Sequence, residues 1–518
     1  MKMLLLIFIS TVIVSNSFSQ TASGYVFNDL NRNGIMEIGE DGIQEICVSN
    51  GLDVVQTDPQ GKWELPISDD TGIFLIKPAN YSVPVNKNMS PQYYYLHKPN
   101  GSPNLEKIGV NPTGDLPESI DFPLILTQEE NEFSALFFGD TQASSPNEVH
   151  YINHDVVEEL IGTGAKFGIT LGDIVGHDLD LFAGISEGIA QIGIPWYYIF
   201  GNHDSNRDAK KNVHRDETFE KYFGPSNYAF EYGQVAFIGF NDVHFDSTGK
   251  YRPHFSTDQI NFLKNYLQYV PEEKLIVLMM HIPIFRAENK EQIFDLLITR
   301  PNTFSISGHV HDQLNVFVGR DNGWENDEPH HHLINATVCG SWWAGQNDET
   351  GIPHATMNDG TPNGYSIITF SGNQYSVKFK AARKPDNYQM NIYAPNIVKV
   401  ESLDTTKILV NVFAGSEKST VDMKIGKSGN WLPLKKVKVI DPECFRMYKL
   451  SPILDQKYNE IALEETLGWK MDKPHISSHI WEGKIDPTLS VGVHTIKVRT
   501  TDMYGQTYRS NRIMYVED

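Results

Sequence analysis

The chain contains a series of polar motifs, each of which follows a short apolar run. In chain order they are Gly139-Asp140-Thr141-Gln142, Leu171-Gly172-Asp173, Gly201-Asn202-His203-Asp204, Met280-His281-Ile282-Pro283 and Gly308-His309-Val310-His311. Continuous apolar runs are typical of strands buried on both faces, and in open α/β sheets ligands gather at the carboxyl ends of the strands. The ordered set therefore predicts that side chains from distant parts of the chain meet at one metal site.

The segments between these motifs alternate between strand and helix patterns. Phe133–Phe138 and Leu275–Met280 are apolar runs of strand length, whereas Glu148–Ile161 and Asp258–Tyr269 have the spacing of amphipathic helices. Residues 128–384 are therefore expected to form an α/β domain whose sheet layers are covered by helices.

The two flanking regions, residues 20–127 and 385–518, show short alternating stretches broken by turn-forming pairs. Each is predicted to be an all-β module of the sandwich type. The expected architecture is a multidomain chain with the α/β domain between the two β modules.

Residues 1–19 are predicted to be a signal peptide. A lysine near the start precedes the apolar run Leu4–Val14, and small residues follow at Ser17 and Ser19. A membrane-spanning helix needs about 20 apolar residues, so the run is too short for an anchor. We expect cleavage after Ser19, a mature chain without a transmembrane segment, and a secreted or periplasmic location.

The charge of the chain restricts its partners. It has 43 Lys and Arg against 65 Asp and Glu, a formal net charge of −22. Such an acidic surface repels phosphate backbones, which argues against a nucleic-acid polymer as partner but not against a local site that handles phosphate.

The order of the motifs resembles that of the calcineurin-like metallophosphoesterase superfamily: an Asp motif, Gly-Asp, Gly-Asn-His, a His after a strand, and Gly-His-x-His. The resemblance covers residues 130–380, and the flanks are similar to the N- and C-terminal modules of one bacterial branch. It implies a two-layer β-sandwich flanked by helices, with two metal ions at its edge.

The resemblance also implies two ligand sets that share Asp173. The first ion would take Asp140, Gln142, Asp173 and His311, and the second would take Asp173, Asn202, His281 and His309. These donors suit divalent Mn, Fe or Zn. Paired ions lower the pKa of bound water, and a metal-bound hydroxide is expected to attack phosphorus directly. Many family members have His in place of Gln142, and the poorer amide ligand is expected to favour Mn or Fe in the first site.

His203, next to the ligand Asn202, is expected to protonate the leaving oxygen or to stabilise charge on the phosphoryl group. Phosphoprotein phosphatases of the family orient this His with an Asp three positions after the bridging Asp, where this chain has Gly176. Asp178 is the predicted replacement, and Asp204 is the alternative.

Arg207 and Arg286 are the candidate phosphate clamps, because arginine binds phosphate through two parallel hydrogen bonds. Each follows one of the metal-site motifs closely. The alternative is that either one is a solvated loop charge.

A second candidate ion site lies in the N-terminal module. Asp29, Asn31, Asn33, Gly34 and Glu40 fit the spacing of a calcium-binding loop, with oxygen ligands at positions 1, 3, 5 and 12 and a glycine at position 6. The stretch resembles the calcium-binding B-type β-repeats of bacterial surface adhesins, which implies a structural Ca²⁺. The alternative is an Asx-rich hairpin turn without an ion.

Two groups of histidines are left outside the predicted site. The run from His330 to His332 is interpreted as the start of a strand with alternating faces. His475 and His479 have helical spacing, but Pro474 and the surrounding β pattern do not favour a helical ligand pair.

The leading functional prediction is an exported di-metal phosphoesterase acting on phosphomonoesters or phosphodiesters. The expected substrate is a phosphorylated small molecule or a phosphate ester derived from envelope or glycan material. One alternative is a secreted adhesion or glycan-binding protein with a non-catalytic phosphoesterase-like domain. Another is a cyclic-nucleotide or pyrophosphate hydrolase.

Overall fold

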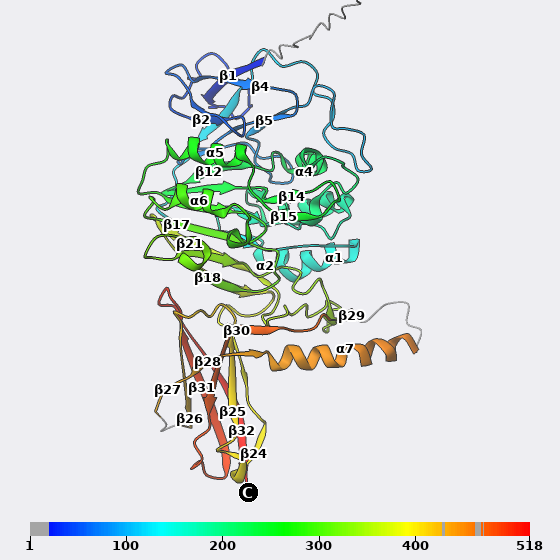
Figure 1. The fold of residues 1–518 in the computed structure, drawn as a ribbon, viewed down its shortest axis with the longest axis vertical. Coiled ribbons are helices and arrows are strands. Elements are labelled where there is room, and N and C mark those ends of the chain that lie inside the picture. Colours follow the sequence, from blue (N-terminus) through cyan, green and yellow to red (C-terminus); the bar gives the residue numbers. More distant parts are fainter. Residues whose placement is uncertain (1–19, 427–429, 461–467, 470) are drawn as a thin grey trace, which may run out of the picture.

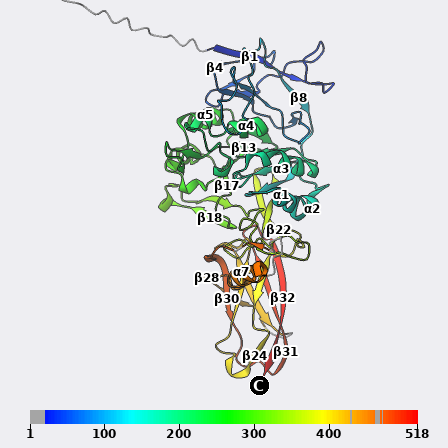
Figure 2. The ribbon, with the colours of Figure 1, turned by 90° about the vertical axis from the view of Figure 1, so that its right-hand side faces the viewer.

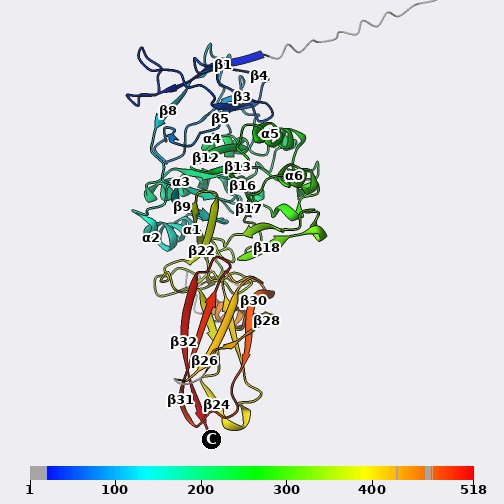
Figure 3. The ribbon, with the colours of Figure 1, turned by 90° about the vertical axis from the view of Figure 1, so that its left-hand side faces the viewer.

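The computed structural model describes residues 20–426, 430–460, 468–469 and 471–518. Three units follow one another along the long axis in chain order, with the α/β domain in the middle (Figure 1). Figures 2 and 3 show the same order from the sides. This arrangement confirms the predicted fold class, whereas the predicted signal peptide, residues 1–19, lies outside the described residues.

The central domain is built on two sheets, with strand orders β11-β10-β9-β21-β22 and β12-β13-β16-β17-β19-β18. The first comprises β9 (Glu132–Phe138), β10 (Gly168–Thr170), β11 (Trp196–Tyr198), β21 (Gly364–Ser371) and β22 (Gln374–Ala381). The second comprises β12 (Tyr228–Tyr232), β13 (Val235–Gly239), β16 (Leu275–Met279), β17 (Thr303–Ser307), β18 (Leu314–Val318) and β19 (His330–Ile334). Strands β9 to β11 are parallel to one another, as are β13, β16, β17 and β19. Their carboxyl ends therefore meet along one edge of each sheet.

The two sheets pack face to face through aromatic side chains. The Phe237 ring lies 5.2 Å from that of Phe167 and 5.3 Å from that of Phe370, between centroids. The outer faces are covered by α1 (Pro146–Ile152), α2 (Glu158–Leu160), α3 (Phe182–Ile189), α4 (Glu217–Phe223), α5 (Thr257–Leu267) and α6 (Lys290–Leu297). A short hairpin, β14 (Val243–Phe245) and β15 (Tyr251–Pro253), lies beside the second sheet. Burial on both faces explains why these strands are nearly all apolar.

Strand β19 shows the effect of this double burial. His330, His331 and His332 begin the strand and alternate between its faces as predicted, with His330 and His332 on Ser305 and His331 on Tyr375, and all three are buried. Both faces of β19 are covered, because His331 packs on Tyr375 of the first sheet and His330 lies against Phe294 of α6. The rings are satisfied by hydroxyl and amide groups, among them Ser305, which contacts the rings of His330 and His332.

The N-terminal module contains two four-stranded sheets, β4-β1-β8-β6 and β3-β2-β5-β7. Their strands are β1 (Gln20–Asn28), β2 (Cys47–Ser49), β3 (Val54–Gln56), β4 (Lys62–Ile67), β5 (Thr71–Leu75), β6 (Tyr81–Ser82), β7 (Tyr94–His97) and β8 (Phe122–Leu126). Lys98 connects the module to the central domain through an ion pair with Glu217 at 2.8 Å.

The C-terminal module is a sandwich of a four-stranded sheet, β23-β25-β30-β28, and a five-stranded sheet, β24-β32-β31-β26-β27. Its strands are β23 (Met390–Tyr393), β24 (Ile397–Lys399), β25 (Lys407–Val412), β26 (Thr420–Ile425), β27 (Leu432–Pro433), β28 (Lys435–Ile440), β30 (Ile476–Lys484), β31 (Gly492–Thr501) and β32 (Thr507–Glu517). A helix that the β pattern does not predict, α7 (Pro442–Glu460), projects sideways from the upper end of the sandwich (Figure 1). Beside it, β20 (Gly345–Gln346) pairs with β29 (Gly468–Trp469). No helix among the described residues is both long and apolar enough to cross a membrane.

Candidate metal centre

The five predicted motifs meet at the carboxyl ends of strands of the central domain. Each predicted ligand stands within four residues of the end of its strand: Asp140 and Gln142 after β9, Asp173 after β10, Asn202 after β11, His281 after β16, and His309 and His311 after β17. All are buried except His309, which is partly exposed. Residues separated by up to 171 positions are thus brought to one place by parallel strand pairing.

Four of these side chains converge on one point. The Nε2 atom of His281 lies 3.1 Å from Asp173 Oδ2 and 3.1 Å from Asn202 Oδ1. It also lies 3.1 Å from His309 Nδ1. The ligand atoms of Asp173, His281 and His309 all lie within 4.8 Å of one another, which is close enough to share one cation. This is the set predicted for the second ion.

The set predicted for the first ion is more open. His311 Nε2 lies 3.6 Å from Asp140 Oδ1, so these two side chains face each other. The amide oxygen of Gln142 is buried and lies 3.8 Å from the thiol of Cys339. The backbone N–H of Gln142 donates to the carbonyl of Asp173, which ties this motif to the shared ligand.

The donor set fits divalent cations. Asp140 Oδ1 is a buried carboxylate oxygen that has no hydrogen-bond partner among the described residues. Buried polar groups normally have a partner, so this oxygen is free to bind a cation. His281 donates from Nδ1 to the carbonyl of Leu171 at 2.9 Å, and His311 donates from Nδ1 to the carbonyl of Gly340 at 2.6 Å. These contacts fix the tautomers and direct both Nε2 atoms into the site, as is usual for metal-binding histidines. The residues therefore suit the two ions that the resemblance implies.

Burial and mutual charge perturb the acid–base groups here. Burial alone would raise the pKa of Asp173 and lower that of His281, but their mutual attraction outweighs burial. The pKa of Asp173 is held below its ordinary value, and that of His281 is raised to about 10. Burial raises the pKa of Asp140 to about 7, and burial together with the charge of His281 lowers that of His309 to about 3. Strong perturbation of several groups in one place is typical of functional sites.

The backbone at the site is strained. Gln142, Asp173, His309 and His311 have φ angles of 38°, 46°, 72° and 58°. Non-glycine residues in this left-handed region cost about 1–3 kcal/mol each and cluster at functional sites. Gly308 is required for a different reason: a Cβ atom there would lie 2.3 Å from Asp140 Oδ2.

His203 lies beside the convergent ligands, whereas Asp178 does not orient it. The His203 Nδ1 atom faces the carbonyl of Gly176 at 3.3 Å, and its ring stacks on that of His177 with centroids 4.0 Å apart. Asp178 is half exposed and pairs with Lys107 of the N-terminal module at 3.0 Å. The prediction that Asp178 orients His203 is therefore wrong. The carbonyl of Gly176 and the ring of His177 contact His203 instead.

Two buried carboxylates support the ligands. Asp204, the alternative orienting residue, instead accepts the backbone N–H groups of Gly201, Ile174 and Val175, and so joins the Asp173 and Asn202 loops. Asp242 accepts the N–H of His281 at 3.1 Å. Asp242 is not among the predicted site residues, although it follows an apolar strand run as the ligands do.

The rim of the site is cationic and aromatic. Arg207 and Arg286 are exposed, and their charges contribute to lowering the pKa of His177 and His309, respectively. The exposed ring of Trp342 stacks on that of His311 at 4.3 Å between centroids. Both arginines thus stand near the predicted centre, and their role as phosphate clamps stays a prediction.

The N-terminal loop brings its two carboxylates inward. Asp29 and Glu40 are buried, while Asn31 and Asn33 are exposed. Asp29 accepts the backbone N–H groups of Asn33 and Gly34, and Glu40 accepts those of Leu30 and Glu37. Calcium binding by this loop stays a prediction.

The comparisons with known proteins cover most of the chain. Residues 133–313 match the sequence model described as calcineurin-like phosphoesterase. Residues 30–112 match the N terminal of calcineurin-like phosphoesterase, and residues 332–508 match its C terminal. No curated protein matches the chain. Among solved structures, the chain is similar to the purple acid phosphatase PPD1 from yellow lupin (Lupinus luteus) seeds, with 12% identity, 65% of this chain and 67% of that chain covered, and a TM-score of 0.35. With the three family matches in consecutive order around the site described above, the chain belongs to the calcineurin-like phosphoesterases and is a metal-dependent phosphoesterase with N- and C-terminal accessory domains.

Proposed function

We propose that the protein is an exported hydrolase that uses two divalent ions, Mn, Fe or Zn, to cleave phosphomonoesters or phosphodiesters. The observation that carries this is the convergence of Asp173, Asn202, His281 and His309 beside the unpartnered Oδ1 of Asp140. Asp140, Gln142 and His311 would complete the first ion's ligands. When bound, such ions lower the pKa of the attacking water and neutralise charge on the phosphoryl oxygens. The proposal involves no covalent enzyme intermediate.

His203 is the proposed proton donor to the leaving group. Its Nδ1 donates to the carbonyl of Gly176, so Nε2 is free to hold a proton toward the site, where it lies 3.9 Å from Asp173 Oδ2. Stacking on His177 limits rotation of the ring. As the bond between phosphorus and the leaving oxygen breaks, a proton from Nε2 prevents the build-up of alkoxide charge.

The proposed substrate is a small phosphate ester, such as a phosphorylated metabolite or an ester released from envelope or glycan material. The exposed guanidinium groups of Arg207 and Arg286 suit phosphoryl oxygens. The net charge of −22 disfavours long polyanions. Export is proposed from the signal-like composition of residues 1–19.

The test is a panel of monoesters, diesters, cyclic nucleotides and pyrophosphates, assayed with Mn²⁺, Zn²⁺ or Fe²⁺ alongside metal analysis. We expect two ions per chain and hydrolysis of simple esters, both lost in Asp173→Ala but retained in Asp486→Ala, which changes an exposed C-terminal carboxylate. Turnover restricted to cyclic nucleotides or pyrophosphates would support that narrower class. Bound ions without turnover of any member would favour a non-catalytic adhesion or glycan-binding role.

A further inference from the structure

The loop between β17 and β18 carries two predicted metal ligands in strained conformations. His309 and His311 both have left-handed backbone angles. Residues in such conformations persist where the surrounding structure holds them in place. On the side of the metal centre, Asp140 Oδ2 accepts the N–H of His309 at 2.9 Å. The contacts that hold the rest of this loop therefore influence the positions of the His309 and His311 imidazoles.

The next two residues of the loop are held from the side of the C-terminal module. Asp312 Oδ1 lies 3.0 Å from His475 Nε2, in an ion pair that joins the loop to the residue preceding β30. The backbone N–H of Gln313 donates to Asp359 Oδ2 at 3.0 Å. His475 also donates its own N–H to the carbonyl of Asn358, next to Asp359, so the two attachments reinforce each other.

Asp359 is in turn fixed by the core of the module. Its Oδ2 lies 3.0 Å from Nε2 of His479 on β30, and both side chains are almost fully buried, with 3% and 1% exposure. His479 Nδ1 faces Asn411 Oδ1 on β25 at 2.7 Å, and Asn411 donates to Asp441 at 2.8 Å. A continuous chain of polar contacts therefore runs from the metal-ligand loop into the C-terminal sandwich.

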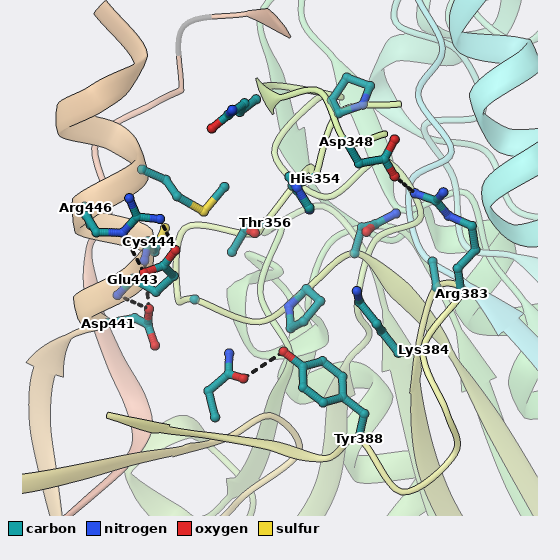
Figure 4. A pocket seen from close by; sticks show the side chains of 18 of the residues that line it. Asp348, His354, Thr356, Arg383, Lys384, Tyr388, Asp441, Glu443, Cys444 and Arg446 are labelled. Atoms are coloured by element: carbon teal, nitrogen blue, oxygen red, sulfur yellow. Dashed lines mark hydrogen bonds and ion pairs between the residues drawn. The ribbon is translucent and has the colours of Figure 1, made fainter. Parts of the chain in front are cut away.

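The chain of contacts ends at the start of α7. Asp441 accepts the N–H groups of Glu443 and Cys444 in the first turn of the helix. Asp441 and Glu443 line a polar cleft of about 380 Å³ between the central domain and the module. Figure 4 shows the side chains around this cleft. The cleft's charged groups are largely paired with one another, for example Arg446 with Glu443. Of the contacts that lead to the ligand loop, the one between Asp359 and His479 is buried, whereas His475 beside Asp312 is half exposed.

We propose that the C-terminal module helps to fix the geometry of the metal centre, and that His475 and His479 are positioning residues for the His309–His311 loop. They act through Asp312 and Asp359, and they touch neither substrate nor ion. The inference rests on the two-ion centre proposed above. Buried polar pairs contribute little to stability compared with apolar packing but can fix one geometry among several, which is the role inferred here.

The experiment measures metal affinity in the full-length protein. His475→Ala removes a half-exposed ring, and His479→Gln replaces a buried ring with a polar amide. His494→Ala is the matched control, because this histidine belongs to the same module and donates to the carbonyl of Ser490. Mn²⁺ and Zn²⁺ affinities are measured by chelator competition, with metal content, circular dichroism and the Tm recorded for each variant.

We expect His475→Ala and His479→Gln to bind metal about 10-fold or more weakly, as for other outer partners of metal ligands. Their kcat should recover when the metal concentration is raised, and His494→Ala should behave as wild type. Wild-type affinity in folded His475→Ala and His479→Gln, even with a lowered Tm, would overturn the inference. If His479→Gln does not fold, Asp312→Asn with His475→Ala decides the question in the same assay. A wild-type protein that binds no ion would instead refute the two-ion centre itself.

Discussion

The Nδ1 atom of His309 lies 3.1 Å from the Nε2 atom of His281, so that imidazole nitrogens from the loops after β17 and β16 point at each other. Two lone pairs at this distance repel unless a proton or a cation lies between them. Asp173 stands within the same group and supplies negative charge. Two imidazoles and one carboxylate thus surround one point at the carboxyl edge of the central domain, an arrangement that suits a divalent cation.

Loss of either neutral ligand at this point should abolish turnover. We expect His281→Ala and Asn202→Ala to lower kcat/KM by at least about 100-fold, because the ion loses a donor and its position. Circular dichroism and the Tm should show a retained fold. Wild-type rates in either variant would contradict the assignment of the site.

The role of His203 can be tested by varying the leaving group. His203→Asn should lower kcat by about 10²–10⁴-fold for alkyl phosphates, whose leaving oxygen needs a proton. The loss should be much smaller for 4-nitrophenyl phosphate. Asp178→Asn should not change this pattern, because its carboxylate pairs with Lys107. An equal loss with both kinds of leaving group would argue against proton donation by His203.

Asp242 should act on metal affinity without touching the ion. Asp242→Asn places an amide where the carboxylate accepts the N–H groups of His281 and Ile282. We expect about a 10-fold weaker metal affinity, measured by chelator competition. Asp246→Asn, an exposed change on the same segment, is the control, and equal affinities for the two variants would exclude the supporting role.

The buried histidines of β19 should make the fold acid-sensitive. Burial lowers the pKa of His330 and His331 from the ordinary 6.5 to about 3. Below pH 6.5 the unfolded chain therefore binds protons that the folded chain cannot, so stability is fully present above that pH and is lost toward pH 3. The loss is about 2 kcal/mol per ring at pH 5.

Denaturant unfolding between pH 8 and pH 4 measures this dependence. His331→Gln should flatten the fall in unfolding free energy, whereas His154→Gln, which changes an exposed histidine, should leave the slope unchanged. The same slope in His331→Gln as in wild type would show that the ring is protonated in the folded state.

Calcium should stabilise the N-terminal module if its loop binds the ion. At a free Ca²⁺ concentration of about 100 times the Kd, binding adds about 2.7 kcal/mol and raises the Tm. Glu40→Gln should remove this rise, and Glu64→Gln on β4 should retain it. A wild-type Tm that does not change with Ca²⁺ would show that the loop is a turn without an ion. The carboxylates of Asp29 and Glu40 would then accept only backbone N–H groups.

The order and position of the site motifs could be predicted because they depend on local patterns. Apolar runs such as Phe133–Phe138 form strands where expected, and parallel strands end at a common edge. The support around the ligands could not be predicted in this way. Its spacing from Asp173 predicts Asp178 as the orienting residue, but the folded loop presents Gly176 and His177 to His203 instead. Asp242 had a recognisable signal, since it follows the run Val235–Phe240.

The family, the order of the three units and the residue types available as ligands could be read from the amino-acid sequence, because strand periodicity and each separate motif are local patterns. How those ligands are held depends on contacts that form only in the folded chain. His479 lies 120 positions from Asp359, and no local pattern says that their side chains meet at 3.0 Å. Such a contact depends on how the C-terminal module packs against the central domain, so it cannot be predicted from local sequence patterns.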